Sequence, residues 1–319
     1  MRRALQLARH GEGRVSPNPM VGAVIVYNGR IIGEGFHAFY GGPHAEVNAI
    51  NSVGKDDRQF LKDSTMYVTL EPCAHYGKTP PCANLIVETG IPRVVIGAMD
   101  PNEKVSGKGL EILKKGGTEV KTGLLDKECR ELNRRFMKAH SSEFPWVILK
   151  WAQSSDGFLA GLDNEGTPKG VKFSSPLSEV WMHRERAGVD AIMVGSNTEK
   201  IDKPLLNVRH WGGNSPKKIV AEGNVDLKQM LKELRKEGIT SVMVEGGGKL
   251  LNSFIQEGFY DEVRREISPI MLNKGVKAPV LPGDISCKDQ RKCRENIIEV
   301  YDRISSAPLM QYIEDGMLR

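Results

Sequence analysis

The hydrophobic residues of this chain fall into short runs that polar turns separate. The runs at 21–27 and 30–36 flank Asn28-Gly29. This dipeptide favours a two-residue turn with positive φ, so the pair predicts a β-hairpin. Other short apolar runs, rich in β-branched residues, predict buried strands at 65–70, 93–98, 146–152, 191–195, 218–221, 241–245 and 263–267.

Amphipathic stretches lie between these runs and predict helices. They cover 1–8, 44–52, 83–89, 126–138, 176–187, 227–237 and 249–256. Strands that alternate with helices of this length indicate layered α/β sheets. A polar segment at 140–145 interrupts the alternation, which restarts beyond it. A chain of 319 residues favours two domains, and we predict them at 1–143 and 144–319.

Composition narrows the class of protein. The chain is 39% hydrophobic and 27% charged and has no apolar run of membrane-spanning length, so we expect a soluble protein without a membrane partner. The first residues lack the apolar run of a signal peptide. Five cysteines, an odd number, favour a reducing cytoplasm over a disulfide framework. The net charge of +5 comes from scattered basic residues, which suits a small anionic substrate and gives no support for a nucleic-acid partner.

Four residues together indicate metal chemistry. His44 and Glu46 open a predicted helix, Cys73 follows a predicted strand, and Cys82 opens another helix. Three nitrogen and sulfur ligands leave the fourth position of a tetrahedral zinc ion open for water, as catalytic sites do. Glu46 is placed to carry the proton of that water. The set predicts hydrolytic removal of an amino group from a purine- or pyrimidine-like ring.

A simpler interpretation makes His44 a helix cap and the cysteines ordinary buried thiols. The spacing of the cysteines separates this chain from nucleic-acid deaminases, because eight residues lie between Cys73 and Cys82 where those enzymes have two. The intervening loop carries His75, Lys78 and Thr79, donors suited to a phosphate oxygen. A solvated surface loop is the alternative.

The first half resembles the bifunctional deaminase/reductase family of riboflavin biosynthesis. The resemblance rests on SPNPMVGAV (16–24), GGPHAE (41–46) and EPCAHYGKTPPC (71–82). It implies a cytidine-deaminase-like α/β/α domain that deaminates 2,5-diamino-6-ribosylamino-4(3H)-pyrimidinone 5′-phosphate. It makes Glu46 the proton shuttle and His44, Cys73 and Cys82 the zinc ligands. The implied substrate residues are Asn18, His37, His75, Lys78 and Thr79.

The second half resembles the reductase domain of the same family through KWAQSSDG (150–157), DAIMVG (190–195), TEKIDKPLLNVR (198–209) and VEGGG (244–248), followed by Asp261-Glu262. The resemblance implies a dihydrofolate-reductase-like α/β fold that uses NADPH to reduce the ribosyl group to ribityl. The implied cofactor residues are Gln153, Lys172, Thr198, Asp202, Gly247, Gly248 and Lys249. The implied substrate residues are Gly170, Arg186, Leu206, Arg209 and Glu245. Arg186 and Arg209 are candidates for a bidentate phosphate clamp.

Two features depart from the family pattern. Lys172 replaces an aromatic residue and Gly170 a serine, and the stretch 220–226 is shorter than usual. A deaminase with a degenerate reductase half is therefore an alternative, and a nucleic-acid base deaminase is a more distant one. The resemblance also implies homo-oligomers that assemble through the reductase domain. Cys129, Cys287 and Cys293 have no assigned role and are interpreted as structural.

Overall fold

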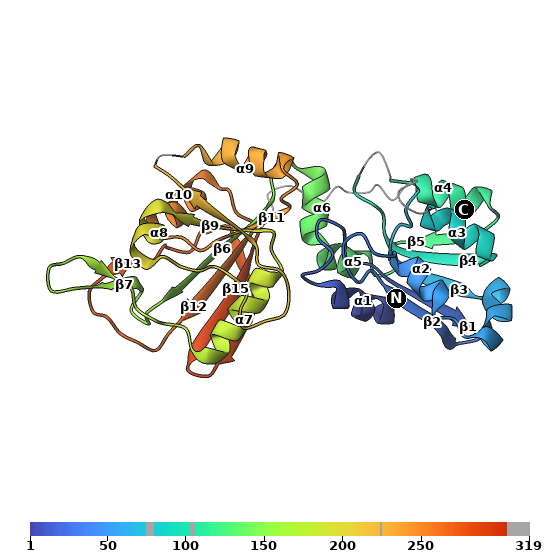
Figure 1. Cartoon of the computed structure of the whole chain (residues 1–319), viewed down its shortest axis with the longest axis horizontal. Helices are drawn as coiled ribbons and strands as arrows, with labels where there is room; N and C mark the ends of the chain where they lie inside the picture. The colour runs from blue at the N-terminus through green and yellow to red at the C-terminus, as the bar shows by residue number, and fades with distance from the viewer. Residues whose placement is uncertain (75–79, 103–105, 224, 305–319) are drawn as a thin grey trace.

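Two β-sheets organise the molecule, one from residues before 123 and one from residues after 145 (Figure 1). The computed structural model describes residues 1–74, 80–102, 106–223 and 225–304. Within them, no helix is both long and apolar enough to cross a membrane.

The first sheet has five strands in the order β2-β1-β3-β4-β5. They are β1 (Gly22–Tyr27), β2 (Arg30–Phe36), β3 (Thr65–Leu70), β4 (Arg93–Ala98) and β5 (Glu119–Thr122). The β1–β2 hairpin forms as predicted, with φ of 46° at Asn28 and 75° at Gly29. β3, β4 and β5 are parallel, so their carboxyl ends meet at one edge of the sheet.

Helices cover both faces of this sheet. They are α1 (Arg2–Ala8), α2 (Ala45–Asn51), α3 (Cys82–Thr89), α4 (Lys108–Lys115) and α5 (Asp126–Leu132), with 3-10 turns at Arg9–Gly11 and Lys55–Asp63. Buried residues of α2, α3 and α4, such as Ala49, Ile86 and Leu113, form one core with the sheet. Apolar residues of α1 and α5, such as Leu5 and Cys129, form smaller clusters with Leu70, Ala98 and Val24. The layering is therefore α/β/α.

The second sheet has seven strands in the order β10-β9-β11-β6-β12-β15-β14. They are β6 (Trp146–Gln153), β9 (Ala191–Gly195), β10 (Lys217–Ala221), β11 (Ser241–Val244), β12 (Glu262–Ile267), β14 (Ile285–Cys293) and β15 (Asn296–Arg303). The first five in spatial order are parallel, and β15 and β14 are antiparallel. The small strands β7 (Phe158–Leu162), β8 (Pro168–Lys169) and β13 (Val276–Lys277) form a separate sheet.

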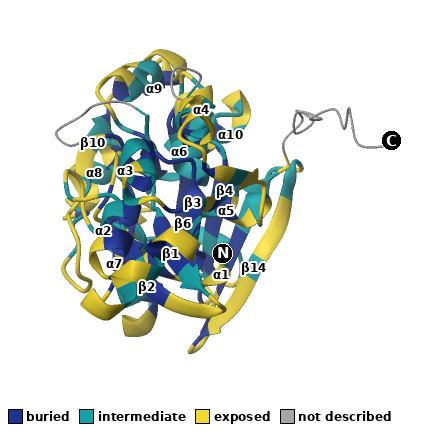
Figure 2. Ribbon diagram, turned by 90° about the vertical axis from the view of Figure 1, so that its right-hand side faces the viewer, coloured by how far each residue is buried: buried dark blue, intermediate teal, exposed yellow. Residues whose placement is uncertain are grey.

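Four helices accompany the second sheet: α7 (Pro176–Ala187), α8 (Ser196–Asp202), α9 (Leu227–Lys236) and α10 (Gly248–Glu257). Buried residues of α9 and α10, such as Leu231 and Phe254, pack on one face. The edge strand β14 is mostly exposed (Figure 2). It carries Lys288, Arg291 and Lys292, charges that oppose edge-to-edge pairing with another sheet.

The predicted helix 126–138 is wrong as a single element. The structure divides it into α5 and α6 (Arg134–Ser141), with Asn133 between them at φ −110°. The side chain of Asn133 accepts from the backbone N–H of Met20 at 2.8 Å and donates to its carbonyl at 2.8 Å. A side chain that pairs with backbone in another segment competes with helix continuation, so this break depends on a tertiary contact.

α6 lies between the two sheets (Figure 1) and contacts the second one through charged groups. Arg134 pairs with Glu262 and, at 2.8 Å, with Asp302. Lys138 pairs with Asp261. Glu262 is fully buried, so its pairing with Arg134 offsets the cost of desolvating its charge. These contacts join the two halves of the chain.

Candidate functional site

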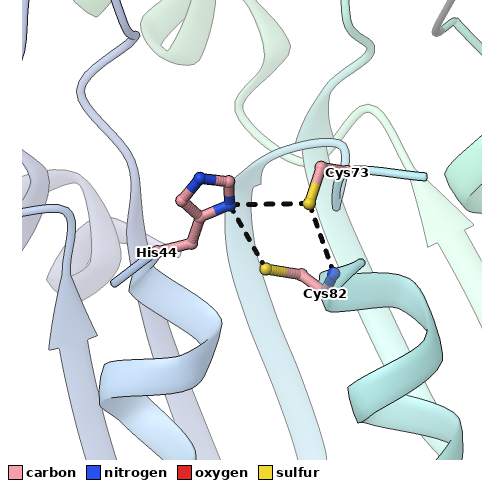
Figure 3. Close-up of side chains that lie close together, drawn as sticks. All are labelled: His44, Cys73 and Cys82. Carbon is pink, nitrogen blue, oxygen red and sulfur yellow. Dashed lines mark hydrogen bonds between the residues drawn. The ribbon is translucent and has the colours of Figure 1, made fainter. Parts of the chain in front are cut away.

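His44, Cys73 and Cys82 converge from three separate segments (Figure 3). His44 is the residue before α2, Cys73 follows β3, and Cys82 is the first residue of α3. Nδ1 of His44 lies 3.5 Å from Sγ of Cys73 and 3.4 Å from Sγ of Cys82. In the part of the chain that the structure describes, this is the one cluster of three or more such groups close enough to hold a metal ion.

The spacing of these atoms fits zinc. A tetrahedral ion with bonds of about 2.0 Å to nitrogen and 2.3 Å to sulfur separates the two ligand atoms by about 3.5 Å. The side chain of His44 makes no hydrogen bond that caps α2, so the capping interpretation is not supported.

The two cysteine sulfurs lie so close together that a thiolate at Cys73 disfavours a thiolate at Cys82. Hydrogen bonding with Cys82, together with His44, lowers the pKa of Cys73 to about 4. The backbone N–H of Cys82 donates to Sγ of Cys73 at 3.2 Å. Proximity to Cys73 in turn raises the pKa of Cys82. A divalent cation between the two sulfurs removes this competition, because a coordinated thiol is deprotonated outright.

Glu46 lies in the first turn of α2 and is 3% exposed. Its Oε2 atom is buried without a hydrogen-bond partner among the described residues. Burial and the nearby Cys73 raise the pKa of Glu46 to about 7. A buried carboxyl of this kind exchanges protons readily near neutral pH, as a general acid and base must.

Asn18 and His37 lie together in the same domain. Nδ2 of Asn18 is 3.1 Å from Nε2 of His37, and Nδ1 of His37 is 3.0 Å from the carbonyl of Pro43. Burial lowers the pKa of His37, which favours the neutral ring. A neutral ring that donates from Nδ1 to Pro43 accepts from Asn18 at Nε2, and this fixes the orientation of the Asn18 amide. His75, Lys78 and Thr79 lie outside the described residues.

Glu71 is a site-supporting residue that motif reasoning missed. Its buried carboxylate accepts four backbone N–H groups at 3.0–3.3 Å, those of Asp100, Gly107, Gly109 and Leu110. It thereby holds the start of α4 against Pro72, the residue before Cys73. The signal was available in the sequence, because a carboxylate directly after a buried strand needs partners of this kind.

In the second half, loops after adjacent parallel strands meet at the carboxyl edge of the sheet. β9 leads into α8 with Thr198, and β11 leads through Glu245 into Gly247 and Gly248. The N–H of Gly247 donates to Oγ1 of Thr198 at 3.1 Å. Among the described residues no side chain caps the N-terminus of α10, and uncapped N–H groups at a helix start suit a phosphate. Edges of this kind bind nucleotide cofactors in open α/β sheets.

Arg186 and Glu245 form a bidentate ion pair with contacts of 2.8 and 2.7 Å, and each side chain is less than 10% exposed. Both donors that a phosphate clamp needs are therefore engaged, so the structure does not support the predicted clamp at Arg186. Burial opposes the charge of Glu245, but Arg186 and the buried Lys150 lower its pKa. The sequence does not indicate that Lys150 lies near Glu245, because a lysine in an apolar strand gives no sign of which acid it faces.

The remaining predicted reductase residues differ in their exposure and in their hydrogen-bond partners. Lys172 is 70% exposed and pairs with Glu179 at 2.8 Å. Gln153 is buried and accepts from Trp151 at 2.9 Å. A Cβ on Gly170 would lie 3.3 Å from a carboxylate oxygen of Asp202, so these two are neighbours. Leu206 is buried, Arg209 donates to the side chain of Asn207, and Lys249 is exposed.

The other cysteines stand apart from the metal cluster. Cys129 and Cys293 are buried, whereas Cys287 is exposed on β14.

Comparison with known proteins identifies the family. Residues 1–98 match the cytidine and deoxycytidylate deaminase zinc-binding region, and residues 145–224 and 217–303 match the RibD C-terminal domain. The riboflavin biosynthesis protein RibD of Aquifex aeolicus is 36% identical, with 94% of each chain covered. The chain belongs to the RibD family of riboflavin biosynthesis proteins. The RibD of Escherichia coli is 33% identical over 89% of this chain and 90% of its own.

Solved structures of the RibD family agree over nearly the whole chain. The diaminohydroxyphosphoribosylaminopyrimidine deaminase/5-amino-6-(5-phosphoribosylamino)uracil reductase of Thermotoga maritima has a TM-score of 0.85 at 33% identity, with 95% of this chain and 97% of that chain covered. The RibD of Acinetobacter baumannii has a TM-score of 0.85 at 32% identity, with the same coverage.

Family membership confirms the predicted fold class and the predicted pair of activities. The chain is a bifunctional enzyme of riboflavin biosynthesis, with a zinc-binding deaminase domain and an NADPH-dependent reductase domain. The match to the RibD C-terminal domain comes in two segments that overlap at 217–224. The overlap falls on part of the stretch 220–226, which is expected from the sequence to be shorter than the family pattern.

Proposed function

We propose that residues 1–143 deaminate 2,5-diamino-6-ribosylamino-4(3H)-pyrimidinone 5′-phosphate and that residues 144–319 reduce the ribosyl group of the product to ribityl. The observation that carries the first step is the cluster of His44, Cys73 and Cys82 in zinc-binding geometry, with the unpaired Oε2 of Glu46 buried beside it.

His44, Cys73 and Cys82 hold the zinc ion. When bound, zinc would lower the pKa of a coordinated water molecule and so supply a nucleophile near neutral pH. Glu46 takes a proton from the water and passes it to the ring nitrogen. It then transfers the second proton to the departing amine. A C–O bond forms, the C–N bond breaks, and ammonia leaves.

Asn18 and His37 orient the pyrimidine. The hydrogen bond to His37 fixes Nδ2 of Asn18, which leaves Oδ1 as an acceptor for an N–H group of the substrate. His75, Lys78 and Thr79 bind the phosphate in this proposal. Their donors suit a phosphate dianion.

In the reductase half, Thr198, Gly247 and Gly248 hold NADPH at the N-terminus of α10, with Gln153, Lys172, Asp202 and Lys249 as further cofactor residues. When bound, NADPH would supply a hydride to the sugar carbon that carries the amine, while the ring C–O bond at that carbon breaks, its oxygen takes a proton from solvent, and NADP⁺ is left. Arg209 binds the phosphate, and Arg186, Glu245, Leu206 and Gly170 line the sugar site. The buried ion pair of Arg186 with Glu245 fixes the direction in which the Glu245 carboxylate points.

The proposal includes a cytoplasmic location, a homo-oligomer assembled through the reductase domain and no nucleic-acid partner. The proposed boundary at 143/144 is supported by the break between α6, which ends at Ser141, and β6, which starts at Trp146.

A coupled assay tests both steps. Purified protein with zinc, NADPH and the diaminopyrimidinone phosphate is expected to release one ammonia and then oxidise one NADPH. Glu46→Gln is expected to reduce ammonia release at least a hundredfold, the usual worth of a positioned acid–base group, while zinc stays bound. Glu88→Gln, which alters an exposed carboxylate on α3, serves as the control. Ammonia release that survives in Glu46→Gln contradicts the mechanism, and ammonia release without NADPH oxidation contradicts the reductase half.

A further inference from the structure

The loop that carries Asn18 is built partly against the reductase domain. Ser16 to Met20 line a cavity of about 890 Å³ between the two domains. Open space therefore lies on one side of this loop, and polar contacts at its two ends help to set its position. At its far end, Met20 is fixed by the paired hydrogen bonds with Asn133.

The other anchor comes from the second domain. Oγ of Ser16 donates to Oδ1 of Asp190, the residue directly before β9. One residue separates Ser16 from Asn18, and a hydrogen bond of 2.8 Å from the N–H of Asn18 to the carbonyl of Val15 closes the turn that contains both. A shift of Ser16 is therefore expected to move Asn18 as well.

Asp190 is itself rigidly held. Its second oxygen, Oδ2, accepts from the N–H of Thr240 at 2.8 Å, the N–H of Ser241 at 3.0 Å and both hydroxyls, at 2.5 and 3.2 Å. Its backbone N–H donates to Ser241 at 3.0 Å. Because Thr240 and Ser241 hold Oδ2, the carboxylate is fixed in orientation and its Oδ1 points toward Ser16.

Two neighbouring contacts keep the domains close at this point. A Cβ on Gly13 would lie 2.8 Å from the carbonyl of Ala187, so the loop runs against the end of α7. Glu12 pairs with Arg184 at 3.0 Å. The loop thus meets the reductase domain over several residues.

We infer that Asp190 of the reductase domain is a positioning residue for the deaminase, acting through Ser16 on the pyrimidine-binding Asn18. The inference rests on the proposed function, since it needs Asn18 to contact the substrate. It predicts that deamination depends on a residue of the reductase domain, although the two active sites lie in different domains.

Steady-state kinetics of the full-length enzyme test the inference. In Ser16→Ala the KM of the deaminase is expected to rise about fivefold, the factor that one net hydrogen bond of about 1 kcal/mol corresponds to. Its kcat is expected to change by less than about twofold, because Glu46 and the zinc ligands belong to other elements. Reduction of the deaminated pyrimidine is expected to match the wild type. Ser141→Ala is the matched control, because within the described part of the chain its exposed hydroxyl donates to carbonyls of its own helix.

A double-mutant cycle identifies the partner. Asp190→Ala is expected to raise the same KM, and adding Ser16→Ala to it is expected to have no further effect. If Asp190→Ala does not fold, comparing the deaminase KM of Ser16→Ala with that of Ser141→Ala still tests the inference. If the wild type releases ammonia but Ser16→Ala leaves the KM of the deaminase unchanged, the inference is wrong and the proposed function stands. A wild type that releases no ammonia contradicts the proposed function, and the inference with it.

Discussion

Replacing Glu71 with glutamine tests whether the zinc site depends on the carboxylate behind it. Oε1 of Glu71 accepts from Gly109 and Leu110, and Oε2 accepts from Gly107 at 3.1 Å and Asp100 at 3.3 Å. Glutamine keeps one acceptor oxygen but points an NH₂ group at the other two N–H donors. Each buried donor left unpaired costs about 1–3 kcal/mol, so Glu71→Gln is expected to destabilise the deaminase domain by about 3 kcal/mol.

Loss of zinc affinity is expected with it. A Cβ on Gly109 would lie 2.0 Å from the carbonyl of Pro72, so the start of α4 packs directly on the residue before Cys73. When the segment that Glu71 holds shifts, Cys73 shifts too. Substitutions of residues that support metal ligands lower metal affinity about 10- to 100-fold. We expect Glu71→Gln to lower zinc affinity about tenfold.

Calorimetry and a competing chromophoric chelator measure the two effects. A loss of about 3 kcal/mol in a domain of this size lowers its Tm by about 10 °C. All four tryptophans, Trp146, Trp151, Trp181 and Trp211, lie in the reductase half, so tryptophan fluorescence reports that half and is expected to shift much less. Glu119→Gln is the control, since this carboxylate is 59% exposed. If Glu71→Gln matches Glu119→Gln in both Tm and zinc affinity, the supporting role of Glu71 is refuted.

Three further predictions follow from the structure. Removing zinc with a strong chelator is expected to abolish ammonia release, leave reduction of the deaminated pyrimidine intact, and be reversed by added zinc; equal loss of both activities would contradict separate sites. Gly35→Ala would bring a Cβ within 2.3 Å of the backbone of α2, so urea unfolding is expected to show a loss of at least about 2 kcal/mol; wild-type stability would show that α2 shifts freely. Glu245→Gln removes the negative charge that pairs with the buried Arg186 and is expected to cost about 3 kcal/mol at pH 7. Because the folded-state pKa of Glu245 is lowered, the stabilisation is present above the ordinary value of 4.5 and is lost as pH falls below it; a pH-independent difference from wild type would contradict this.

Much of the fold followed from local patterns. The runs at 65–70, 93–98 and 191–195 are strands with the predicted bounds, because these parallel strands are mostly buried and mostly apolar. The strands β14 and β15 were missed. β14 is a charged edge strand, so its residues carry no apolar alternation.

The deaminase site was predictable and the reductase site less so. His44, Glu46, Cys73 and Cys82 are reactive residue types whose positions at strand and helix ends already imply convergence. The engagement of Arg186 by Glu245 could not be predicted, because the residues are 59 positions apart and either could have faced solvent.

The sequence by itself determined the chemistry of this protein, because ligand types and their spacing specify a metal and a reaction without reference to distant contacts. Only the tertiary structure decided what holds those residues in place. Asn133 ends α5 by pairing with Met20, Glu71 gathers four N–H groups, and Asp190 reaches Ser16 across the domain boundary. Each is a polar group whose partner lies far along the chain, and local periodicity carries no information about such pairs.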